Sequence, residues 1–212
     1  MTGHRLLVVV LGTLVLAGAL TGVLLATTRA GSSQPSAAGE PYRGSRPPSG
    51  IRIANVSLPS YRGGMVDLRA QRGRVVVLTF LDSKCTDACP IIAGVVAQTW
   101  PRLRPNEKAQ ARALGISVNP IVDTPASVRT FLAARHAEAA LDWLVAPVKQ
   151  MRPVWKDFSV LPATQTGSDD IHSADVRIYD RRGTWVSTLH AGIDLTPANL
   201  VHDIRSALRS GS

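Results

Sequence analysis

The apolar positions of the chain form one long N-terminal run and a series of shorter, periodic segments. Residues 6–27 carry no charge, and a run of this length can cross a bilayer as a helix. Residues 28–50 are rich in Gly, Ser, Pro and Arg, which predicts a flexible tether. We therefore expect a signal anchor or transmembrane helix over 1–27, a tether over 28–50 and a folded domain over 51–212.

Within the predicted domain, strand-like and helix-like segments alternate. Continuous β-branched and apolar runs at 74–81 and 111–118 predict strands that are buried on both faces. Thr124 and Thr196 are the expected N-caps of two helices. The predicted elements, in order, are a hairpin over 51–60 and 65–73, strand 74–81, helix 90–100, strand 111–118, helix 124–137, strand 141–147, helix 148–160, strands 174–180 and 184–192, and helix 196–210.

This order predicts an α/β fold with a mixed sheet flanked by helices, because strands alternate with helices and a hairpin follows late in the chain. It fits a thioredoxin-like fold that carries an extra N-terminal β-hairpin. A chain of 212 residues can bury a core without the help of disulfides. The two cysteines of the chain therefore require another explanation, and the fold alone does not supply one.

The net charge of +9 comes mostly from arginine. The basic residues are scattered, with no run of five or more, so a tract that binds nucleic acid is not indicated. Two explanations are open, a solvated basic surface or attraction to anionic headgroups or an acidic partner. The scattered positions favour the solvated surface.

Both cysteines lie in the segment "LDSKCTDACP", between a predicted buried strand and a predicted helix. The unpaired N–H groups and partial positive charge at a helix N-terminus favour thiolate over thiol, and Lys84 adds positive charge. Cys85 and Cys89 stand at i and i+4, which places them on one face when the segment is helical. The spacing leaves room for a metal ion between the sulfurs, and a disulfide is also compatible with it.

Two thiolates alone coordinate most metals incompletely, and the chain has no third cysteine for a structural zinc site. Two thiolates and one imidazole suit copper, particularly Cu(I). Of the five histidines, His172 lies in a polar loop before a strand that we expect to neighbour the strand before Cys85. His172 is therefore the candidate imidazole beside Cys85 and Cys89, although a lone histidine in a loop is more often merely solvated.

Three motifs resemble the Sco/SenC family. "VVVLTFLDSKCTDACP" is similar to the family's strand and C-x-x-x-C-P loop, "ALGISVNPIVDTPASVRTFL" to its next strand and helix, and "IHSADVRIYDRRG" to its histidine loop and following strand. The resemblance spans roughly Ile51 to Arg209. The matching residues are Cys85, Asp87, Cys89, Pro90, Ser117, Val118, Pro120, Asp123, Thr124, Pro125, His172, Ser173, Asp180 and Gly183.

The resemblance implies a thioredoxin-like metallochaperone that binds copper, as Cu(I) or Cu(II), through Cys85, Cys89 and His172. It further implies that the protein delivers copper to the CuA site of cytochrome c oxidase subunit II, or reduces the dithiol of that site. The implied partners are subunit II or another cuproprotein acceptor, and an upstream copper donor or thiol reductant. With the predicted anchor, this places the protein in the cell membrane as a single-pass protein whose C-terminal domain is extracytoplasmic.

The sequence departs from the family pattern at three places. Asn119 replaces the usual aspartate, residues 82–84 replace a more aromatic stretch, and Pro101 shortens the helix after the cysteines. None of these changes removes a predicted ligand. Asp87 is expected either to orient the cysteine loop through backbone N–H groups or to act as a simple turn residue.

The alternative function is a metal-independent thiol-disulfide oxidoreductase that acts on extracytoplasmic cysteine pairs. One of Cys85 and Cys89 would attack and the other would resolve the mixed disulfide. Against this stand the C-x-x-x-C spacing and the absence of a proline between Thr164 and Arg177, where thioredoxin-type reductases usually carry one. A peroxidase is less favoured, because the loop lacks the threonine expected three residues before Cys85.

Overall fold

The computed structural model describes residues 41–210 of the chain. The predicted transmembrane helix over 1–27 and residues 28–40 of the predicted tether lie outside this range. Among the described residues, no helix has the length and apolar character needed to cross a membrane.

A five-stranded mixed sheet forms the centre of the domain, in the order β5-β4-β3-β6-β7. Within this sheet, β3, β4 and β5 run parallel to one another, and β6 and β7 form an antiparallel hairpin whose first strand pairs with β3. All seven residues of β3 are buried, as the apolar run at 74–81 predicts. The strands are β3 (Val75–Leu81), β4 (Ala111–Ser117), β5 (Leu141–Leu144), β6 (Asp175–Tyr179) and β7 (Trp185–His190).

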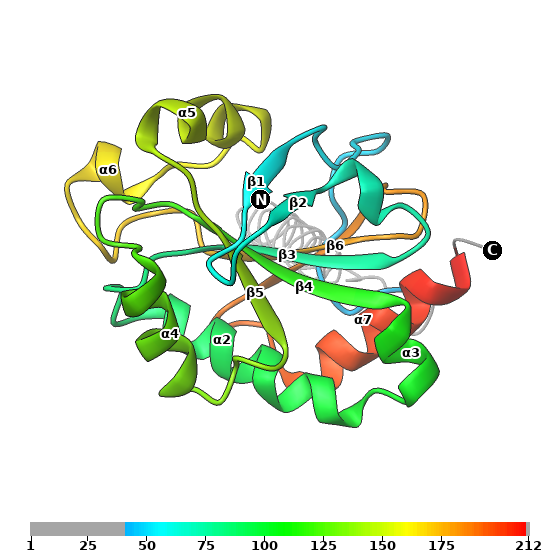
Figure 1. The fold of residues 1–212 in the computed structure, drawn as a ribbon. Coiled ribbons are helices and arrows are strands. Elements are labelled where there is room, and N and C mark those ends of the chain that lie inside the picture. Colours follow the sequence, from blue (N-terminus) through cyan, green and yellow to red (C-terminus); the bar gives the residue numbers. More distant parts are fainter. Residues whose placement is uncertain (1–40, 211–212) are drawn as a thin grey trace, which may run out of the picture. The chain divides into compact units, whose positions relative to one another are not determined.

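Helices and a small hairpin cover the two faces of this sheet (Figure 1). One face packs against α2 (Ala88–Thr99), α4 (Pro125–Ala133) and α7 (Pro197–Ser210). The other packs against α5 (Val148–Asp157), α6 (Ala163–Thr166) and a separate two-stranded sheet of β1 (Ser57–Pro59) and β2 (Met65–Asp67). The predicted thioredoxin-like architecture with an extra N-terminal hairpin is therefore confirmed.

The predicted start of α4 and the predicted end of α2 are confirmed, because single side chains determine both. The Thr124 hydroxyl accepts a hydrogen bond from the Ser127 amide and caps α4, and Pro101 ends α2 in a 3₁₀ turn over Trp100–Arg102. The short helices α3 (Pro105–Ala109) and α6 were not predicted. Segments of five and four residues are too short to show helical periodicity in a sequence.

Residues 41–50, which the sequence places in the tether, lie against the folded domain. The amides of Arg43 and Gly44 donate to the buried carboxylate of Asp203, at 2.7 and 3.0 Å, and Ser45 pairs with Thr188 of β7. Gly44 is required here, because a Cβ atom would collide with the Ser187 side chain and the Thr188 backbone. The composition of this segment predicts a tether, but backbone amides hold it in place.

Candidate metal centre

The three predicted ligands converge at the edge of the sheet where β3 ends. Cys85 follows β3, Cys89 lies in the first turn of α2, and His172 lies in the loop before β6. The antiparallel pairing of β6 with β3 brings this loop beside the cysteines, as the sequence predicts. The ligand atoms of all three residues lie within 4.8 Å of one another, and His172 Nε2 is 3.4 Å from Cys89 Sγ.

Both sulfurs are buried and accept hydrogen bonds from backbone amides. The Cys89 amide donates to Cys85 Sγ, and the Asp82 amide donates to Cys89 Sγ, each at 3.4 Å. A hydrogen bond from the Cys89 thiol lowers the pKa of Cys85 to about 5 against the opposing effect of burial, and His172 contributes in the same direction. The same thiol–thiolate bond, together with burial, raises the pKa of Cys89. Cys85 is therefore the more acidic of the two thiols in the reduced site.

The imidazole of His172 is oriented toward the sulfurs by its own neighbour. Nδ1 lies 2.8 Å from the Ser173 carbonyl oxygen and so donates its hydrogen there, which leaves Nε2 directed at the cysteines. Burial lowers the pKa of His172, but the bonds to Cys85 and to the Ser173 carbonyl outweigh it and raise the pKa overall. This tautomer is the one that a metal bound at Nε2 requires.

Carboxylates from three segments fix the backbone of the cysteine loop. Asp82 belongs to the loop itself, Asp123 precedes α4, and Asp170 lies in the histidine loop. The amides of residues 83, 84 and 86 donate to Asp123, Asp82 and Asp170 at 2.8, 2.7 and 2.7 Å, respectively. The cysteine loop is thereby held to both neighbouring segments before any metal binds.

Asn119 joins the same segments through its side-chain amide. Nδ2 donates to Asp82 Oδ2 at 2.8 Å and to Asp169 Oδ1 at 2.9 Å, and Asn119 is only 7% exposed. Burial raises the pKa of Asp82, and the bonds from Asn119 and from the Lys84 amide oppose this effect. Two departures from the family pattern, at positions 82 and 119, therefore contact each other directly.

The structure also distinguishes between the roles expected of single residues. Asp87 is exposed and makes no side-chain cap bond at the start of α2, so it acts as a turn residue and Asp170 orients the loop instead. His190 and His202 pair with Asp194 and Asp203, respectively, and neither belongs to the group formed by the cysteines and His172. The functional residues that sequence reasoning missed are Asp82, Asp169 and Asp170. Asp169 and Asp170 form an acidic pair close to His172 in the sequence, and this pair was the one feature that could have pointed to them.

Residues 53–209 match the family model for SCO1/SenC. The chain belongs to the SCO1/SenC family. A search of curated protein sequences found no match. The motifs that carry the resemblance in the sequence thus mark a true relationship, which covers nearly all of the described domain.

Solved structures of SCO1/SenC proteins share this fold. Apo Sco1 from Thermus thermophilus is 20% identical with a TM-score of 0.66, covering 81% of this chain and 99% of that one. ScoI from Bradyrhizobium japonicum, solved with copper bound, is 22% identical with a TM-score of 0.58, covering 74% and 100%. BsSco, described as a cytochrome c oxidase assembly protein with a disulfide switch, is 19% identical with a TM-score of 0.63, covering 77% and 96%.

Proposed function

We propose that this SCO1/SenC protein is a copper chaperone that holds one copper ion between Cys85, Cys89 and His172. The observation that carries the proposal is the convergence of two buried sulfurs and a correctly oriented imidazole within 4.8 Å. Two thiolates and one imidazole form a donor set suited to Cu(I), which accepts low coordination numbers. The copper-bound ScoI of Bradyrhizobium japonicum supports the choice of metal.

The proposed acceptor is the CuA site of cytochrome c oxidase subunit II, or another cuproprotein that offers a pair of thiols. The description of BsSco as an oxidase assembly protein supports this class of acceptor. Copper binding requires both cysteines to be reduced, so an upstream reductant or copper donor controls loading. The apolar run over 6–27 supports a membrane anchor that keeps an extracytoplasmic domain near its membrane-bound acceptor.

The experiment is copper binding by residues 41–212 after full reduction and without oxygen. We expect one tightly held copper per chain, lost in Cys85→Ala and in Cys89→Ala and weakened in His172→Ala. His202→Ala is the matched control, because His202 lies on α7 beside Asp203 and its loss should leave copper binding unchanged. Failure of the reduced protein to retain copper would refute the proposal.

One observation favours the alternative function, a thiol-disulfide oxidoreductase. Cys85 has a lowered pKa and lies beside a buried thiol with a raised pKa, which is the arrangement of an attacking and a resolving cysteine. The two functions differ at His172, because copper coordination needs its imidazole as a ligand, whereas thiol exchange uses it only to help lower the pKa of Cys85. Reductase activity that survives His172→Ala in a protein that binds no copper would establish the alternative.

A further inference from the structure

Basic side chains gather at the end of the sheet opposite the metal centre. β3 and β4 run parallel, so the loops that precede them lie at the far edge from the cysteine loop, which follows β3. The antiparallel strand β6 ends at that same edge. We define the basic end as Arg72, Arg74, Arg102, Arg104, Lys108, Arg181, Arg182, Arg205 and Arg209.

Hydrogen bonds to backbone carbonyls draw these residues together from four distant segments. The Gly73 amide donates to the Arg181 carbonyl at 2.7 Å, which joins the loop before β3 to the turn after β6. The Val75 amide donates to the Gln110 carbonyl at 2.8 Å, and Arg205 donates to the Arg102 carbonyl at 3.2 Å. Figure 1 shows α3 beside α7 at this end of the domain. A scattered set of arginines in the sequence is therefore one surface in the fold.

Two carboxylates at this end, Glu107 and Asp180, lie beneath the basic side chains. Glu107 is 4% exposed and is shared by Arg104 and Arg205, with N–O distances of 2.8 and 3.0 Å. Asp180 is fully buried and pairs with Arg182. Because each of these carboxylates is buried while most of the basic residues are exposed, the outer surface is positively charged.

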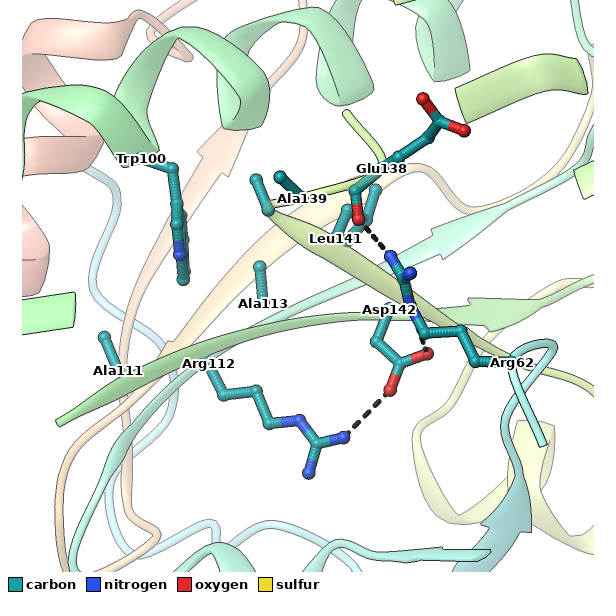
Figure 2. A pocket seen from close by; sticks show the side chains of 10 residues that line it. Arg62, Trp100, Ala111, Arg112, Ala113, Glu138, Ala139, Leu141 and Asp142 are labelled. Carbon is teal, nitrogen blue, oxygen red and sulfur yellow. Dashed lines mark hydrogen bonds and ion pairs between the residues drawn. The ribbon is translucent and has the colours of Figure 1, made fainter. Parts of the chain in front are cut away.

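At the neighbouring edge strand β5, a half-buried carboxylate also lies between arginines, and the exposed Glu138 lines the same pocket. Asp142 lies between two guanidinium groups, with Arg112 at 2.8 Å and Arg62 at 3.9 Å (Figure 2). Half-buried Trp100 lines the adjoining hollow, which has a volume of about 270 Å³. Tryptophan is an amphipathic side chain that is enriched where proteins meet the headgroups of a membrane.

The described chain also begins beside this end. The Tyr42 hydroxyl lies 2.9 Å from the Ser210 hydroxyl at the C-terminal end of α7, close to Arg209 in sequence. Tyr42, near the start of the described residues, therefore lies next to the basic end. Residues 28–40 can span at most about 45 Å when fully extended. An anchored chain would thus keep this surface near the membrane.

We propose that the basic end docks on an anionic membrane surface and turns the metal centre away from it. Positive charge within about 8 Å of anionic headgroups escapes most salt screening, and each basic residue there adds to binding. In this orientation the Cys85–Cys89–His172 edge faces the extracytoplasmic space, where an acceptor domain can approach. The proposal rests on the proposed membrane location, and it is independent of copper binding.

The test is cosedimentation of residues 41–212 with lipid vesicles. Solved relatives align over almost their whole length with 74–81% of this chain, so the domain can be studied alone. At an ionic strength of about 0.15 M, we expect binding to vesicles of phosphatidylglycerol mixed with phosphatidylcholine, and none to pure phosphatidylcholine. The triple variant Arg74→Glu, Arg102→Glu, Lys108→Glu should bind weaker by on the order of 100-fold.

A matched variant tests whether binding depends on where the basic residues lie or only on the net charge of the protein. Arg129→Glu, Lys149→Glu, Lys156→Glu changes the charge by the same amount at exposed positions of α4 and α5, and should keep most of the binding. Equal weakening of both variants, or no preference for anionic vesicles, would overturn the proposal. So would binding to poly-glutamate without binding to vesicles, which would assign the surface to an acidic protein. Copper binding by the basic-end variant should be unchanged, so failure of the chaperone proposal would be seen separately.

Discussion

At the scale of single residues, the reactivity of the site depends on one proton shared between two sulfurs. Cys85 accepts the hydrogen bond of the Cys89 thiol, and this bond lowers the pKa of Cys85 to about 5. The attacking species in thiol chemistry is the thiolate. The sulfur with the lowered pKa is therefore the better nucleophile of the two.

We predict that iodoacetamide modifies Cys85 far faster than Cys89 in the reduced, metal-free protein. The rate at Cys85 should stay nearly constant from pH 8 down to about 6 and fall as the pH drops through about 5, because protonation then removes the thiolate. Peptide mass spectrometry of quenched samples measures both rates. In Cys89→Ala the inflection should move to higher pH, and an unmoved inflection would contradict the shared-proton account.

Asn119 is the residue whose substitution tests how the site is held together. Asn119→Asp replaces two N–H donors with a carboxylate that faces the carboxylates of Asp82 and Asp169. We expect copper affinity to fall by about 10- to 100-fold, as is usual when an outer hydrogen-bond partner of a metal site is lost. Asn119→Ala removes both bonds without adding charge and should cost less. Wild-type affinity in Asn119→Asp, measured by competition with a Cu(I) chelator, would contradict this role.

At the scale of elements, the metal centre is a junction of two loops. The cysteine loop follows a strand at the centre of the sheet, while the histidine loop precedes β6 and is anchored by the Ser173 amide, which donates to the Leu161 carbonyl at 2.9 Å. Asp170 joins the loops through the Thr86 amide and hydroxyl. Two loops held in this way need little reorganisation when copper binds.

We predict that Asp170→Ala lowers copper affinity by about 10-fold and leaves thermal stability nearly unchanged. The side chain is exposed, so its loss removes loop contacts without disturbing the core. Asp87→Ala is the control, since Asp87 carries the same charge in the same region and makes no side-chain cap bond. Equal losses of affinity in both variants would show that charge alone, and not the Thr86 contact, matters.

At the scale of the whole molecule, Glu107 links α3 to α7 beneath the basic end. Burial opposes ionisation, but hydrogen bonds from Arg205 and Arg104 prevail and lower the pKa of Glu107 to about 2. A carboxyl group with a lowered pKa in the folded state stabilises the protein above its unfolded pKa near 4.5. This contribution is lost as the pH falls from there through about 2.

We therefore expect Glu107→Gln to reduce the free energy of unfolding at pH 7 by on the order of 2 kcal/mol, the scale of hydrogen bonds to a charged group. The difference from wild type should shrink as the pH falls toward 2, because Glu107 then becomes increasingly protonated and resembles the uncharged Gln. Urea unfolding at several pH values measures it. Glu138→Gln, at an exposed position, should have little effect. A difference that persists at pH 2 would mean that packing and not charge is responsible.

The sequence by itself determined most of the elements and the three candidate ligands. The continuous apolar run of β3, the Thr124 cap and the i, i+4 cysteines are local features, and local features determine strands, helix starts and loop chemistry. His172 could be chosen because the order of elements predicts that its loop neighbours the cysteine loop, as the pairing of β6 with β3 confirms.

Tertiary structure alone decided what the remaining polar residues do. Asp170 meets the Thr86 amide across 84 positions of sequence, and Asn119 meets Asp82 and Asp169 across 37 and 50. The basic end likewise brings together basic residues from separate loops, although these residues form no continuous basic run in the sequence. Such contacts arise because the parallel pairing of β3 with β4 and the antiparallel pairing of β3 with β6 bring distant loops to one edge of the sheet. The spacing of these residues along the chain does not show that they lie close together.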